Sequence, residues 1–128
     1  HDYTTIGPGA LNDALAAMAL SAMTRRAILQ RSRNILRTQW PILEKWIAQH
    51  KKVFSVAPPQ AGAIALLKYS KKTNSTRLAN RLRKEKSVLV VPGDHFLMDG
   101  YVRIGYGGQR AHLEEGLRRL SEMLSRTS

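Results

Sequence analysis

The stretch VPGDHFLMDGYVRIGYG, residues 91–107, has the alternation of a strand but places an arginine, Arg103, between two β-branched apolar residues. A guanidinium among apolar neighbours is costly unless an anion meets it. That anion can belong to the chain itself, as Asp94, Asp99 or a carboxylate on a helix. It can also belong to a ligand whose carboxylate accepts two parallel hydrogen bonds from the guanidinium. Spacing alone does not decide between these two interpretations.

The segments around this stretch predict a small layered domain. Short apolar segments predict strands and leucine-patterned segments predict helices, in the order strand, strand, helix, strand, strand, helix. The expected fold class is α/β, with an α+β small domain in which a compact, mostly antiparallel sheet has helices on one side. The predicted strands cover 53–56, 63–69, 87–93 and 101–107. One predicted helix is capped by Asn74 or Ser75, and a second, closing helix contains Leu113, Leu117, Leu120 and Leu124.

Upstream, a wide apolar stripe at helical spacing predicts a long helix that faces a core. Pro41 lies inside this pattern, and a proline there removes one backbone hydrogen bond and clashes with the preceding turn. We therefore expect one long bent N-terminal helix, with the bend near 37–41, that lets a small domain close. The stripe consists of Ile28, Leu29, Ile35, Leu36, Trp40, Ile42, Leu43, Trp46 and Ile47.

The composition is that of a strongly basic globular chain. Its 128 residues include 21 Lys or Arg and 9 Asp or Glu, which gives a formal net charge of +12. Such a charge suits polyanions, so a basic nucleic-acid-binding module is an alternative from another class, as is a free-standing interaction domain. Because the charges are spread over several helices without a recognition motif, we do not expect a nucleic-acid partner.

The sequence also argues against disulfides, metal sites and insertion into a membrane. The sequence has no cysteine, so disulfides and thiolate metal sites are absent, and its four histidines are too scattered for a zinc site. No apolar run approaches the ~20 residues that cross a bilayer, so we expect no membrane partner. Cysteine-free composition fits a reducing compartment, and we expect a cytoplasmic protein.

The quoted stretch and its continuation, VLVVPGDHFLMDGYVRIGYGGQRAHLEEGLRRL, resemble the C-terminal end of the class I/II aminotransferases, pyridoxal-phosphate enzymes of fold type I. In that family a strand ending in V-x-V-x-P-G and a phenylalanine lead into a Y-[VI]-R-[ILF] tract, followed by a leucine-patterned helix. Earlier motifs agree in order, so the resemblance covers essentially the whole chain. These motifs are DYTTI at 2–6, R-x-R-x-I-L at 31–36, Trp40 to Trp46, and PPQAGA at 58–63.

The resemblance implies an enzyme that transfers an amino group between an amino acid and a 2-oxo acid, with Arg103 binding the substrate's α-carboxylate. Residues 1–37 would be the end of the large cofactor domain and the start of the connecting helix. Residues 38–128 would be the C-terminal small domain. Gly62 and Ala63 would shape the substrate entrance, with a plain tight turn as the alternative.

The resemblance also implies a homodimer that holds pyridoxal 5'-phosphate. The stretch with Tyr3, Thr4 and Thr5 resembles a loop near the dimer interface and the cofactor; ordinary surface turn chemistry is the equal alternative. The family's Schiff-base lysine, phosphate loop and pyridinium carboxylate lie N-terminal to the matched part. We therefore expect a fragment that holds no cofactor, has no catalytic residue and is inactive alone. A C–S lyase or an α-oxoamine synthase of the same fold would use the same arginine, and the sequence does not separate these reactions.

Overall fold

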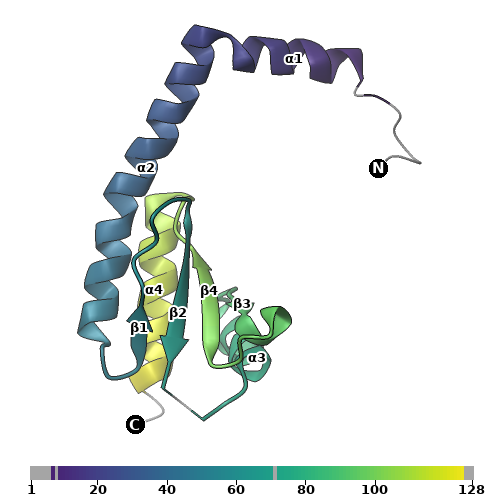
Figure 1. The fold of residues 1–128 in the computed structure, drawn as a ribbon. Helices are drawn as coiled ribbons and strands as arrows, with labels where there is room; N and C mark the ends of the chain where they lie inside the picture. The colour runs from purple at the N-terminus through teal and green to yellow at the C-terminus, as the bar shows by residue number, and fades with distance from the viewer. Residues whose placement is uncertain (1–6, 8, 71, 126–128) are drawn as a thin grey trace. The chain divides into compact units, whose positions relative to one another are not determined.

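The computed structural model describes residues 7, 9–70 and 72–125 (Figure 1). Packing divides the chain into two compact units, His1–Asn34 and Ile35–Ser128. The assignment of 1–37 to a cofactor domain and of 38–128 to a small domain stays a prediction.

The first unit contains helix α1, Ala10–Leu20, and the start of helix α2, Ala22–Gln49. None of the side chains of α1 is buried. Ile28 and Leu29 are 44% and 38% exposed, so the prediction that they face a core is wrong for the described part of the chain. The stripe begins to pack against a core only from Leu36 onward.

Helix α2 runs without interruption through Pro41. This confirms that the apolar pattern on both sides of the proline belongs to one helix; the bend stays a prediction. The helix survives because a proline removes a single backbone bond, whereas the following turns bury Leu43, Trp46 and Ile47 in the core. Burial of such side chains stabilises a helix by more than one lost hydrogen bond costs it.

The second unit is built on a four-stranded sheet in the order β1-β2-β4-β3, with every neighbouring pair antiparallel (Figure 1). The strands are β1, Phe54–Val56; β2, Ile64–Tyr69; β3, Val91–Pro92; and β4, Tyr101–Gly105. The strand predicted over 87–93 is only two residues long. It is short because Ser87 has a left-handed backbone with φ of 52°, Pro92 has no N–H, and the chain then turns into the 3₁₀ helix η1, Gly93–Phe96.

Among the described residues of the second unit, helices cover one face of this sheet and none lies on the other, which we call the open face. In Figure 1, α4 (Arg110–Ser125) runs behind the sheet, and α3 (Ser75–Lys86) lies behind its β3 end. The expected α/β fold, with a small antiparallel sheet and helices on one side, is confirmed. No described helix is long and apolar enough to cross a membrane. The core behind the sheet combines Leu43, Trp46, Ile47, Phe54, Ala65, Leu67, Tyr69, Leu78, Leu82, Val102, Ile104, Leu113, Leu117, Leu120 and Met123.

Candidate functional site

Arg103 lies on the open face of the sheet. Its strand neighbours Val102 and Ile104 are 1% and 7% exposed, so they point to the helices, and alternation turns Arg103 the opposite way. The expectation that the apolar strand neighbours of Arg103 lie around its guanidinium is therefore wrong, because they face the other side of the sheet. The residues paired with Arg103 across the sheet are Leu66 on β2 and Val91 on β3, and they leave it half-buried on an apolar surface.

The guanidinium of Arg103 makes no ion pair with any carboxylate in the part of the chain that the structure describes. Its neighbour is an aromatic ring: the Cζ atom lies 5.3 Å from the ring centroid of Phe96, within the range of a cation–π interaction. The two carboxylates offered by the sequence as partners, Asp94 and Asp99, bind elsewhere. The internal salt bridge that competed with a ligand site is thus not found among the described residues.

Asp94 and Asp99 instead join η1 and the following turn to the start of α3. Asn74, one of the two caps that the sequence offered, is the N-cap of α3. Its amide donates to Asp94 over 2.9 Å, and the Thr76 hydroxyl donates to the same carboxylate over 2.8 Å. The Asp94 backbone N–H donates to the Ser75 hydroxyl, and the Ser75 backbone N–H donates to Asp99 over 2.7 Å. These bonds satisfy donors that a helix start leaves unpaired and fix the 93–99 segment beside β4.

The hydrogen bonds also shift the pKa of Asp94. Burial acts to raise this pKa, but the bonds from Thr76, Asn74 and Ser75 together outweigh it and lower the pKa from 3.8 to about 2. A carboxylate whose pKa is depressed by folding stabilises the folded state above its unfolded pKa. That stability is lost as the pH falls through the folded value.

We expect this network to give an acid-dependent stability. The free energy of unfolding of the unchanged chain should decrease as the pH falls from above 3.8 towards 2, because Asp94 takes up a proton in the unfolded chain while it stays ionised in the folded one. In Asp94→Asn the same decrease should be smaller. Urea unfolding of both proteins at a series of pH values measures the difference, and equal pH dependence would contradict the assignment.

Gly62 and Ala63 lie at the C-terminal end of β4, away from the guanidinium. The Tyr106 N–H donates to the Ala63 carbonyl and its hydroxyl donates to the Gly62 carbonyl, each over 2.8 Å. Gly62 has φ of +79°, a conformation that favours glycine. A Cβ on Gly107 would meet the Ala63 Cβ at 2.5 Å, so the turn packs closely against the chain at Gly107. Tyr106 is three positions beyond Arg103, about 10 Å at the spacing of a strand, so the structure places the predicted site residues at separate points of the sheet.

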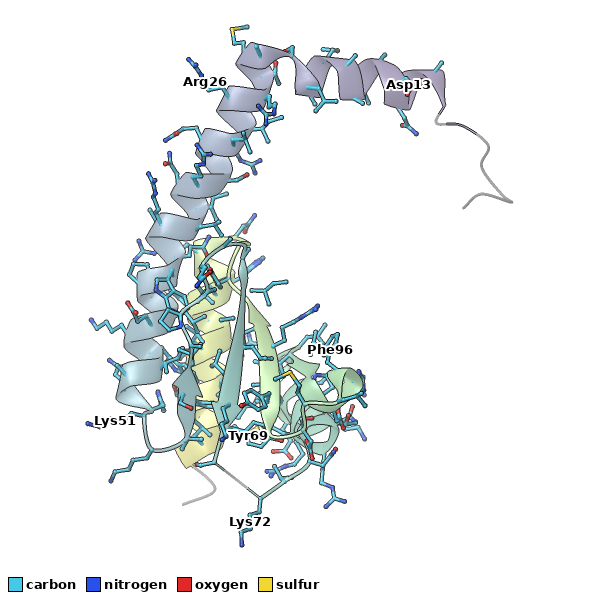
Figure 2. All side chains as sticks on the ribbon, in the orientation of Figure 1. Asp13, Arg26, Lys51, Tyr69, Lys72 and Phe96 are labelled. Atoms are coloured by element: carbon cyan, nitrogen blue, oxygen red, sulfur yellow. The ribbon has the colours of Figure 1, made fainter. Side chains whose placement is uncertain are left out.

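The remaining predicted positions, Tyr3, Thr4 and Thr5, lie outside the described residues. The residue that sequence reasoning missed is Phe96, labelled at the β3 end of the sheet in Figure 2. The sequence carried a signal for it, since this phenylalanine belongs to the P-G…F…Y-V-R-I-G unit. Only the fold of the 93–100 segment places its ring against the arginine.

The chain matches one family model and one curated relative over most of its length. The family model of aminotransferase class I and II matches residues 3–120. Capreomycidine synthase from Streptomyces vinaceus is 32% identical over 126 residues, which cover 96% of this chain and 31% of that protein.

Two solved structures cover nearly the whole chain. A PLP-dependent aminotransferase from Streptococcus suis 89-1591 is 34% identical with a TM-score of 0.91, over 99% of this chain and 33% of that one. The PLP-dependent cyclase OrfR, in complex with Au, has a TM-score of 0.89 at 24% identity, over 99% of this chain and 35% of that one, and this likeness concerns the fold alone. The chain thus spans about a third of the length of these proteins.

Proposed function

Because the chain belongs to the class I and II aminotransferase family, we propose that it is the C-terminal part of a pyridoxal-phosphate-dependent aminotransferase. In this proposal the enzyme transfers an amino group between an amino acid and a 2-oxo acid, and Arg103 binds the α-carboxylate that both substrates carry. One observation supports the role of Arg103 above all. Its half-buried guanidinium lies on the open face of the sheet without a carboxylate partner among the described residues.

The surroundings of Arg103 suit a ligand carboxylate. Leu66 and Val91 beside it on the sheet offer no acceptor side chain, so the guanidinium keeps its donors for an incoming anion. A planar guanidinium matches a carboxylate through two parallel hydrogen bonds, and partial burial strengthens them relative to water. Such a two-point contact fixes the orientation of the bound amino acid as well as its position.

The described residues fit the substrate rather than the cofactor. When bound, pyridoxal phosphate supplies an electron-withdrawing ring that stabilises the charge left as the Cα–H bond breaks. Arg103 would hold the α-carboxylate so that the Cα–H bond is oriented for proton removal, which is positioning work. The seated turn at Gly62 and Ala63 would shape the substrate entrance, and Tyr3, Thr4 and Thr5 would lie near the interface of a homodimer.

A synthase reaction on an amino acid is the second candidate. It is favoured by one observation, the 32% identity to a protein named capreomycidine synthase. A lyase or an α-oxoamine synthase of the same fold would also need the α-carboxylate to be held. The arginine therefore does not distinguish these reactions. Identification of the products is needed to tell them apart.

The test is a stoichiometric assay on the complete protein loaded with pyridoxal phosphate. Each proteinogenic L-amino acid is supplied with and without 2-oxoglutarate, and all products are quantified. An aminotransferase consumes about one equivalent of amino acid per cofactor without the acceptor and turns over only with it. Continued consumption without the acceptor, with release of a thiol or formation of a cyclic product, would replace amino transfer by a lyase or synthase reaction.

A further inference from the structure

We infer that Phe96 is a positioning residue for Arg103, whose ring holds the guanidinium on the open face of the sheet in the orientation that receives the α-carboxylate. The inference rests on the proposed role of Arg103. It adds a second residue to the site, at a position to which sequence reasoning gave no role.

The geometry of the pair supports this role. The Arg103 Cζ atom lies over the Phe96 ring at 5.3 Å from its centroid. An aromatic face attracts a cation through its quadrupole, and the phenylalanine ring carries no oxygen or nitrogen acceptor. The N–H groups that grip a carboxylate point outward in the guanidinium plane. The ring can therefore hold Arg103 in place without competing for the donors that the substrate needs.

The contact also replaces the restraint that an ion pair would give. An arginine side chain has several rotatable bonds, and ordering it on substrate binding costs conformational entropy. Phe96 restricts that freedom before the substrate arrives, yet it adds no carboxylate that the substrate would have to displace. This arrangement is a form of preorganisation.

The backbone that carries Phe96 is itself firmly held. Gly93, at the start of η1, packs so closely that a Cβ there would meet the Met98 carbonyl oxygen at 2.1 Å. Asp94 and Asp99, on either side of the phenylalanine, are bonded to the start of α3. Phe96 is 49% exposed, so its contact with Arg103 is not simply a consequence of core packing.

The inference is tested in the complete protein loaded with pyridoxal phosphate, with 2-oxoglutarate and the L-amino acid of highest turnover in the product assay. Phe96→Leu keeps an apolar side chain but removes the ring. We expect the KM for the amino acid to rise roughly two- to fivefold, with kcat and the absorbance of the bound cofactor little changed. Phe96→Tyr keeps the ring and should restore the original KM.

The matched control is Leu97→Ala, in the same segment, because the Leu97 side chain is 98% exposed. Its KM should stay at the original value. An unchanged KM in Phe96→Leu, or an equal rise in Phe96→Leu and Phe96→Tyr, would overturn the inference. If Phe96→Leu does not fold, Phe96→Met takes its place, because methionine also keeps an apolar side chain without a ring, and the same rise in KM is expected.

Failure of the underlying proposal gives a different result. If Arg103→Lys leaves amino-acid turnover intact, Arg103 does not bind the α-carboxylate and the role of Phe96 falls with it. If Arg103→Lys impairs turnover while Phe96→Leu does not, the arginine assignment stands and only the positioning role is lost.

Discussion

Replacement of Arg103 by Gln in the complete enzyme is expected to lower kcat/KM for the amino acid by roughly 30- to 4,000-fold. Removal of one partner of a desolvated charge pair costs about 2–5 kcal/mol, and here the abandoned partner would be the substrate carboxylate. Arg103→Lys should fall between Gln and the original residue, because an ammonium keeps the charge but not the planar two-point contact. Steady-state kinetics of the three proteins give this series directly.

The absorbance of bound pyridoxal phosphate should stay unchanged in the Arg103 variants, since none of the proposed contacts of Arg103 is to the cofactor. Arg81→Gln is a matched control, because it makes the same change at a surface arginine whose partner is Glu85 on the same helix. Its kcat/KM should equal that of the original enzyme. If Arg103→Gln has the same kcat/KM as the unchanged enzyme, Arg103 does not bind the substrate carboxylate.

The second large effect is expected on stability, from Gly93→Ala. A Cβ at this position would meet two backbone carbonyl oxygens, that of Met98 at 2.1 Å and that of Tyr101 at 2.6 Å. Backbone cannot rotate aside as a flexible side chain can, so the 93–100 segment must shift. We expect a loss of about 3 kcal/mol, the upper end for overpacking. For a unit of this size that corresponds to a fall of roughly 12–24 °C in Tm, measured by thermal unfolding of this chain.

Gly116 offers a control of opposite sign. It lies within α4, and a Cβ there would meet nothing within 4 Å. Gly116→Ala should raise stability by about 0.5–1 kcal/mol, because alanine loses less backbone entropy than glycine in a helix. If Gly93→Ala unfolds at the temperature of the unchanged chain, the close approach in the 93–100 segment is wrong.

Much of the second unit was predictable because its elements are short and strongly patterned. A nearly continuous apolar run predicted β2, and alternation in YVRIG predicted β4. The cap of α3 was predicted at Asn74 or Ser75 from their position before a helical pattern, and it is Asn74. Pro41 did not mislead the prediction, since the apolar spacing continued in phase on both sides of it.

The features that escaped prediction depend on contacts between distant residues. The face of the sheet on which Arg103 lies follows from the packing of Val102 and Ile104 on the helices, which no local pattern specifies. The shortness of β3 reflects the left-handed residue Ser87 and the turn at η1. The contact of Phe96 with Arg103 requires the whole 93–100 segment to be folded against α3.

The two-sided character of β4 has a consequence for how this strand can change during evolution. Point substitutions alter one face at a time, so variation at Tyr101 or Arg103 need not disturb the packing of Val102 and Ile104. Insertion or deletion of a single codon is different, because it exchanges the faces of every later position. Related proteins should therefore preserve the length of this strand even where its amino acids have changed.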